Sequence, residues 1–178
     1  MVVKKLLTNI FWILSEIEAS FSKPNDYLLF RRTYLRLMKV KVGKKFWVGK
    51  SLNLFNGGDF TIGERCALGS FVRIENWSGI QIGDDFVAAP GLHLNSGDHD
   101  PVTFKPKPLP IKIGDRVWCG VDVTIISGAT IGDDVVIGAG SVVVKDIPSN
   151  SIAAGVPAKV IKPLERKNKK HLWPWVNQ

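Results

Sequence analysis

The chain has 178 residues, of which 45% are apolar and 22% are charged. These fractions are typical of a globular protein and argue against a disordered chain, and the length favours a single domain. Two cysteines, Cys66 and Cys119, are too few for a disulfide framework, so we expect a cytoplasmic location.

The net charge of +8 is distributed unevenly along the chain. Residues 1–50 carry 11 basic and 3 acidic residues, residues 51–150 carry 7 and 12, and residues 151–178 carry 6 and 1. Nucleic-acid-binding proteins usually gather their cations on one recognition surface, whereas the centre of this chain is acidic. We therefore expect no nucleic-acid partner.

Residues 1–41 are predicted to form an N-terminal helical cap. Apolar residues recur at helical spacing over residues 3–17, which indicates an amphipathic helix. Pro24 ends this helix, and a second helix is predicted over residues 27–38. The apolar run at residues 6–14 is too short to span a bilayer. Packing on the body or in an oligomer is the favoured interpretation, with peripheral attachment to the inner face of an anionic membrane as the alternative.

From residue 42 to residue 148 the chain repeats in units of six residues, and the leading residue of each unit is apolar. These leading positions are Ile62, Leu68, Ile74, Ile82, Ala88, Leu94, Ile113, Cys119, Ile125, Ile131, Ile137 and Val143. A period of six fits neither a helix nor an alternating strand, but it fits short strands that each cover one face of a triangular prism. We therefore predict an all-β solenoid, a parallel β-helix of about five coils, with each leading side chain inside.

An inserted loop at residues 95–112 interrupts the repeat once. It contains four prolines, which disfavour regular structure, and one histidine, His99. Loops that project from a rigid scaffold commonly carry function. The predicted organisation is thus a helical cap, a β-helix at residues 42–148 with this loop, and a C-terminal cap and basic tail at residues 149–178.

The run IGDRVWCGVDVTIISGATIGDDVVIGAGSVVVKDIPSNSIAAGVPAKVIK, residues 113–162, resembles the C-terminal half of hexapeptide-repeat acyltransferases. It is most similar to the sugar O-acetyltransferases, such as the maltose, galactoside and colanic-acid enzymes, and the resemblance extends over residues 42–163. It implies a left-handed β-helix, a homotrimer, and acetyl-CoA bound in a groove between neighbouring subunits. We expect an acetyl-CoA-dependent O-acetyltransferase that acts on a hydroxyl of a sugar or polysaccharide precursor, without a metal.

The resemblance also implies roles for individual residues. A histidine in the matching loop of the family is the general base, and His99 falls there; imidazole can accept and return a proton near neutral pH. Asp100 is the candidate to orient the ring, with Asp98 or a backbone carbonyl as alternatives. A backbone N–H near the turn at Cys119 and Gly120 could stabilise the oxyanion.

The remaining candidates are residues that would contact the cofactor or the acceptor. Positions that match the family's cofactor contacts are Trp118, Gly120, Val121, Ala139, Gly140, Val144, Lys145, Lys159 and Lys162. Asn76, Trp77 and Asn95 are candidates for an acceptor pocket. Gly69 and Ser70 stand where the maltose and galactoside enzymes have an asparagine for the acceptor hydroxyl, which argues against those sugars.

Three alternatives remain, one of them within the same enzyme class. An amino-sugar N-acetyltransferase could use the same fold and base, and a catalytically silent trimeric scaffold would keep the same repeats. A γ-carbonic-anhydrase-like zinc protein would need three histidine ligands. The chain has three, but His93 and His99 are predicted on neighbouring faces of one coil, and His171 is in the basic tail.

Overall fold

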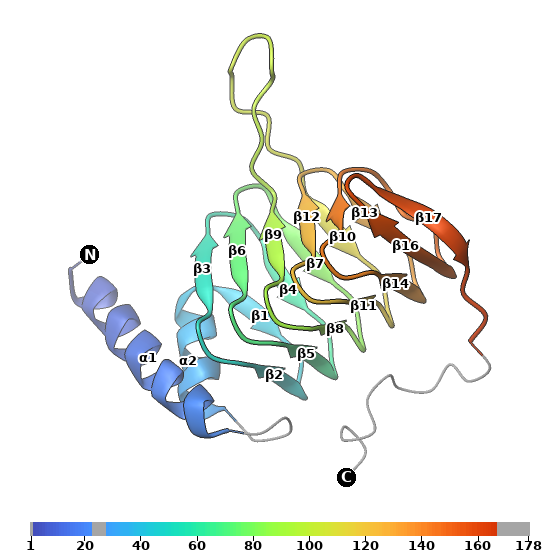
Figure 1. Ribbon diagram of the computed structural model, residues 1–178. Helices are drawn as coiled ribbons and strands as arrows, with labels where there is room; N and C mark the ends of the chain where they lie inside the picture. Colours follow the sequence, from blue (N-terminus) through green and yellow to red (C-terminus); the bar gives the residue numbers. More distant parts are fainter. Residues whose placement is uncertain (1, 23–27, 167–178) are drawn as a thin grey trace.

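The computed structural model describes residues 2–22 and 28–166, so His171 and most of the basic tail lie outside the described residues. The chain folds into a parallel β-solenoid with two helices at its N-terminal end and a β-hairpin at its C-terminal end (Figure 1). A long loop projects from the solenoid where the sequence predicts one. Among the described residues, no helix is long and apolar enough to cross a membrane.

The solenoid has three sheets, one for each face of a triangular prism. Sheet A contains β1 (Val40–Val42), β4 (Phe60–Ile62), β7 (Ile80–Ile82), β10 (Ile111–Ile113) and β13 (Thr130–Ile131). Sheet B contains β2 (Phe46–Val48), β5 (Cys66–Leu68), β8 (Val87–Ala88), β11 (Trp118–Cys119), β14 (Val135–Ile137), β16 (Ser151–Gly155) and β17 (Ala158–Pro163). Sheet C contains β3 (Asn53–Asn56), β6 (Arg73–Asn76), β9 (His93–Asn95), β12 (Thr124–Ile126) and β15 (Val142–Val143). We call the three corners of the prism the AB, BC and CA edges, in chain order.

The six-residue repeat places its leading side chains in the core, as predicted. Ile125 of β12 is in register with Leu94 of β9 and with Val143 of β15, and all three side chains are fully buried. Stacked aliphatic side chains of this kind bury the apolar face of every coil against its neighbours. The solenoid has about six turns rather than the predicted five, because β16 continues sheet B beyond β14 before β17 turns back antiparallel.

The N-terminal end of the solenoid is covered by α1 (Val2–Phe21) and α2 (Leu29–Leu37). The Trp12 indole donates to the carbonyl of Leu52 at 3.3 Å. Glu16 accepts hydrogen bonds from the N–H groups of Ser51 and Leu52 and pairs with the buried Arg31 at 2.8 Å. The first helix therefore packs on the body through one of its faces, as the favoured interpretation of its sequence expects.

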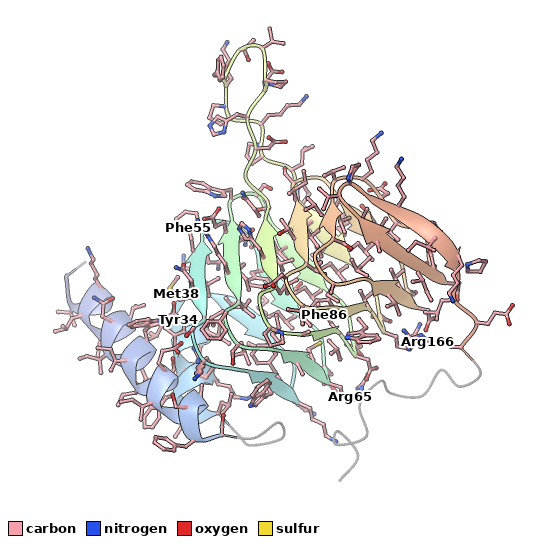
Figure 2. All side chains as sticks on the ribbon, viewed as in Figure 1. Tyr34, Met38, Phe55, Arg65, Phe86 and Arg166 are labelled. Carbon is pink, nitrogen blue, oxygen red and sulfur yellow. The ribbon has the colours of Figure 1, made fainter. Side chains whose placement is uncertain are left out.

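The AB edge is closed by a ladder of polar groups. At each turn one residue has a φ of 56–57°, and these residues are Arg65, Asp85, Arg116, Asp134 and Asn150. Beside them, Asp84 accepts a hydrogen bond from the N–H of Glu64, Asp115 accepts one from Asp84, and Asp133 accepts one from Asp115. Carboxylates that bind backbone N–H groups satisfy donors that the turn leaves without a carbonyl partner. Figure 2 shows Arg65 and Arg166 on the side of the prism away from Phe55, a residue of β3 in sheet C.

Candidate active site

The loop that carries His99 connects β9 to β10 at the CA edge and extends away from the solenoid (Figure 1). The prolines do not prevent it from pairing with itself: His99 bridges Pro106, Asp100 N–H donates to the Lys105 carbonyl at 2.9 Å, and Lys107 N–H donates to Asp98 at 2.8 Å. The loop is thus a narrow hairpin-like projection, more ordered than its sequence predicts. It holds the exposed His99 side chain beyond the surface of the prism.

The two aspartates beside His99 have structural tasks. Asp98 Oδ1 accepts the backbone N–H of His99 at 2.7 Å. Asp100 Oδ1 accepts hydrogen bonds from the N–H groups of Thr103 and Val102 and from the Thr103 hydroxyl, at 2.8–3.0 Å. The bonds from Thr103, followed by the bond from Val102, hold the pKa of Asp100 below its ordinary value. Among the described residues no hydrogen bond joins either aspartate to the His99 ring, and the role of Asp100 in orienting this ring stays a prediction.

The base of the loop contains the predicted acceptor residues. The rings of Trp77 and Phe55 pack with their centroids 4.3 Å apart, and Trp77 is 55% exposed. Asn95 ends β9 and accepts the N–H of Gly97 at 2.8 Å. A side chain at Gly97 would meet the indole of Trp77 at 2.6 Å, which explains a glycine there. Trp77 and Asn95 therefore lie together on the edge that carries His99.

Asn76 requires a correction, because its side chain is fully buried in the wall of the CA edge. Its amide nitrogen donates to Asn56 at 2.6 Å and to the carbonyl of Asp59 at 3.2 Å. Its oxygen accepts from Gly79 N–H at 2.8 Å and from the Ser96 hydroxyl at 3.2 Å. With these hydrogen-bonding groups used inside the protein, Asn76 does not present its amide to an acceptor.

Five of the predicted cofactor residues lie on a different edge. Trp118 is in β11 itself, and the residues that follow β11 and β14 along the BC edge are Gly120, Val121, Ala139 and Gly140. Trp118 is 49% exposed on the outer surface of sheet B. The N–H of Gly120 donates to the carbonyl of Ile137, whereas no acceptor among the described residues takes the N–H of Val121. The N–H of Val121 is therefore a backbone donor without a partner among the described residues, one residue later than the sequence suggests.

The turns of the BC edge contain glycines at positions 120 and 140, where other residues would add a side chain. A Cβ on Gly120 would come within 2.7 Å of the backbone nitrogen of Ala139, so the two turns stack too closely for any larger residue at position 120. A Cβ on Gly140, by contrast, would have no atom within 4 Å, so the surface above Gly140 is open. At positions 120 and 140 the BC edge thus carries backbone without a side chain.

The other cofactor candidates do not join this group within one chain. Val144 and Lys145 follow β15 at the CA edge, and both are exposed. Lys159 and Lys162 are exposed on β17, where they pair with Ala154 and Ile152 of β16. Within one chain the predicted site residues therefore lie on two separate edges. One edge carries His99, Trp77, Asn95 and Lys145, the other carries the residues around Gly120, and sheet C lies between them.

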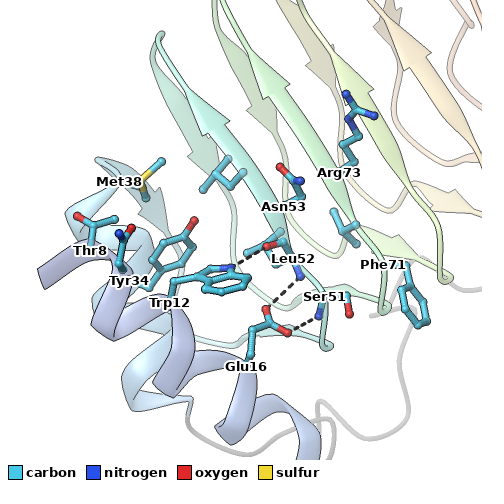
Figure 3. Close-up of a pocket in the computed structure, with 13 residues that line it drawn as sticks. Thr8, Trp12, Glu16, Tyr34, Met38, Ser51, Leu52, Asn53, Phe71 and Arg73 are labelled. Carbon is cyan, nitrogen blue, oxygen red and sulfur yellow. Dashed lines mark hydrogen bonds between the residues drawn. The ribbon is translucent and has the colours of Figure 1, made fainter. Parts of the chain in front are cut away.

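A cavity of about 750 Å³ opens between the helices and the start of sheet C, and the sequence analysis did not anticipate it. Figure 3 shows Trp12 and Glu16 from α1, Tyr34 from α2, Phe71 from the BC edge, and Arg73 from β6 around it. Aromatic and aliphatic side chains share its walls with the polar or charged residues Thr8, Asn9, Glu16, Ser51, Asn53 and Arg73. In the sequence Trp12 is one more apolar residue of an amphipathic helix, so no local signal marks it as a cavity residue.

The cysteines and histidines give no sign of other chemistry in the described part of the chain. Burial raises the pKa of both Cys66 and Cys119 to about 12, so neither is a nucleophile near neutral pH. Burial, followed by the charge of Arg73, lowers the pKa of His93. Residues 2–22 and 28–166 contain no group of three His, Cys, Asp or Glu side chains arranged to hold a metal ion.

The fold and repeat define the chain as a β-solenoid transferase. Residues 110–145 match the family described as bacterial transferase hexapeptide (six repeats), and residues 60–95 match the hexapeptide repeat of succinyl-transferase. Galactoside O-acetyltransferase of Escherichia coli (strain K12) is 36% identical over 158 residues, which cover 85% of this chain and 77% of that protein. The chain belongs to the hexapeptide-repeat acetyltransferases, in the branch of the sugar O-acetyltransferases. It is therefore an acyltransferase enzyme.

Solved structures agree with this assignment. The maltose O-acetyltransferase from Clostridium difficile 630 superposes with a TM-score of 0.70 and 31% identity, over 92% of this chain and 86% of the other. Galactoside acetyltransferase in complex with coenzyme A superposes with a TM-score of 0.59 and 27% identity, over 92% and 86% of the two chains. A relative of the same fold thus binds coenzyme A.

Proposed function

We propose that this enzyme transfers an acetyl group from acetyl-CoA to a hydroxyl of a sugar or glycan precursor, at a site shared between two copies in a homotrimer. One observation carries the proposal: the candidate base and most of the candidate cofactor residues lie on opposite edges of sheet C. In a ring of three prisms, the CA edge of one copy can face the BC edge of the next. Each such interface would bring His99 together with the turn at Gly120.

The chemistry requires no covalent enzyme intermediate. The neutral imidazole of His99 accepts the proton of the acceptor hydroxyl while the hydroxyl oxygen attacks the thioester carbon. The carbonyl oxygen becomes an oxyanion, and the N–H of Val121, which has no partner among the described residues, is the donor proposed to stabilise it. The C–S bond then breaks, and the imidazolium returns its proton to the thiolate of CoA. The O-acetyl sugar and free CoA are the products.

The cofactor would lie along the BC edge. Trp118, Ala139 and Gly140 border the channel proposed for the thioester and pantetheine arm, and no metal takes part. Lys145, Lys159 and Lys162 provide positive charge for the phosphates of the nucleotide, as exposed ammonium groups commonly do. Val144 contributes an apolar contact beside Lys145.

The acceptor would enter between the two edges. Trp77 and Asn95 lie near His99 on one copy. The cavity beside α1 begins at Ser51 and Phe71 of the BC edge, on the same edge as the proposed cofactor channel. An aromatic wall from Trp12 with nearby amide groups from Asn9 and Asn53 suits a sugar ring.

Product analysis tests the proposal. The purified enzyme is incubated with acetyl-CoA and a panel of neutral, acidic and amino sugars and oligosaccharides, while thiol release is recorded and products are identified by mass spectrometry. We expect O-acetylated products. Exclusive acetylation of amines would replace the proposal with the N-acetyltransferase alternative, and the absence of turnover with every acceptor class would favour the silent scaffold.

A further inference from the structure

The outer face of α1, which points away from the solenoid, is a continuous apolar stripe. It consists of Val3, Leu6, Ile10, Ile13, Ile17 and Phe21, whose exposed fractions lie between 42% and 86%. Their spacing of three or four residues places them on one side of the helix. Ser15 and Ala19, on the side that faces the body, are buried. The exposure of the stripe is therefore not a consequence of a loosely attached helix.

The apolar surface continues onto α2. Phe30 packs on Phe11 of α1 with ring centroids 6.3 Å apart and is itself 36% exposed, and the adjacent Leu29 is 54% exposed. Soluble proteins seldom expose a contiguous apolar area across two helices unless it contacts a partner or a membrane. The outer face of α1 with these two residues is such an area.

At this end of the molecule the exposed cations outnumber the exposed carboxylates. Both acidic residues of α1 have hydrogen-bond partners: Glu16 as described above, and Glu18 by accepting the N–H groups of Arg31 at 2.9 Å and Phe30 at 3.3 Å, both in α2. Lys5 and Lys39 lie together along a groove beside α1. Further exposed cations of this end of the molecule are Arg36, Lys41, Lys44, Lys45 and Lys50.

We propose that the outer face of α1 docks on an anionic lipid bilayer, with the helix lying flat in the headgroup region. An apolar stripe combined with basic residues is the pattern by which amphipathic helices bind such surfaces. The positive charge of this end of the molecule favours an anionic bilayer over a second copy of the same face. Two copies would bring their cations together, whereas anionic headgroups neutralise them. This proposal does not depend on the chemistry at His99.

Vesicle flotation with the full chain tests the proposal. Phosphatidylcholine vesicles with phosphatidylglycerol are compared with phosphatidylcholine alone, at low and high salt. We expect co-flotation with the anionic vesicles that weakens at high salt. The double variant Ile10→Gln with Ile13→Gln should lower the bound fraction by about tenfold or more, because two apolar anchors are lost. The variant Lys5→Glu with Arg36→Glu should lower it by about tenfold, mainly on anionic vesicles.

A matched control uses an exposed isoleucine at the other end of the molecule. Ile161 on β17 is 64% exposed, and Ile161→Gln should leave flotation unchanged. Ile17→Gln alone provides a second, milder variant if the double variant does not fold. Absence of wild-type flotation, or an equal loss in Ile161→Gln, would overturn the proposal. So would loss of oligomeric mass in the α1 variants, measured by light scattering, because it would identify the partner as a second copy.

Discussion

The AB and CA edges are built by the same six-residue repeat, yet their polar groups have different roles. At the AB edge Asp134 is nearly buried and pairs with Arg116 at 2.9 Å and with Arg166 at 3.2 Å. At the CA edge the repeat is interrupted, and the His99 ring is exposed on a projecting hairpin. The carboxylates of the AB edge are occupied by hydrogen bonds and ion pairs that hold the turns together, so they are not available for chemistry. Within the described residues the His99 ring takes no part in such bonds and is available.

From this comparison we expect the largest loss of catalytic rate when the His99 ring is removed. His99→Ala should lower kcat by about 10³-fold, since general acid–base catalysis contributes roughly 10²–10⁴-fold. The oligomer and the melting temperature should not change, because the ring makes no hydrogen bond in the described chain. Thiol release from acetyl-CoA measures the effect. Lys107→Ala, in the same loop, is the control, and a similar loss in that variant would contradict the assignment.

The division of the site between two edges can be tested by mixing two inactive variants. His99→Ala removes the candidate base from the CA edge, and Ala139→Trp is designed to block the proposed cofactor site on the BC edge. When both chains are co-expressed, about a quarter of the interfaces combine two intact edges, because each edge is intact in half of the chains. We expect about a quarter of the wild-type activity from the mixture. If activity does not return, the site is confined to one chain.

The AB edge should govern stability and leave catalysis unaffected. Asp134→Ala removes a nearly buried carboxylate from two arginines and should lower the free energy of unfolding by about 3 kcal/mol. Denaturant unfolding measures this loss, and kcat at a permissive temperature should stay at the wild-type value. Asp133→Asn keeps the oxygen that accepts the N–H of Asp115, so its effect should be below about 0.5 kcal/mol.

The turn at the tip of the loop should have a smaller effect on rate. Asp100→Ala removes the acceptor for Thr103 and Val102, loosens the hairpin, and should lower kcat by about fivefold through poorer positioning of His99. Asp100→Asn keeps an acceptor oxygen and should retain most of the rate. Because the pKa of Asp100 is lowered, its carboxylate stays ionised throughout the neutral range, and neither variant should move the pH profile. A shifted profile would instead give Asp100 a role in proton transfer.

The ionisation of the two buried cysteines should have the smallest effect on stability at neutral pH. Their folded pKa of about 12 lies above the ordinary value of 9.0, so their contribution to stability is complete below pH 9.0 and is lost as the pH rises towards 12. Ellman's reagent at pH 8 should not react with the folded protein and should label both thiols in urea. Rapid labelling of one thiol in the folded state would contradict this interpretation.

The core of the solenoid could be predicted because its signal is local and repeated. Each leading residue, such as Leu94 or Ile125, occupies an equivalent place in a coil, so one period in the sequence determines the inside of every face. The sixth turn and the ordered hairpin lie where the period weakens or stops. There the hydrogen bonds of particular residues decide the structure, and no pattern in the sequence reports them.

The site was less predictable than the core. Asn76 stood in the right segment, yet its amide is used inside the CA edge by partners about twenty residues away in sequence, Asn56 and Ser96. Trp12 and Arg73 border one cavity only because α1 folds back across the first coils. Contacts between distant segments of this kind leave no periodic trace in the sequence.

The sequence by itself determined the repeat, the inward residues, the place of the interrupting loop and the family, since each follows from the order and spacing of residues along the chain. Only the tertiary structure decided that the candidate base and most of the cofactor residues stand on different edges, and that α1 turns its acidic groups inward and its apolar stripe outward. Which edge or face a side chain occupies depends on how the coils stack and how the helices pack against them, and these contacts join residues far apart in the chain.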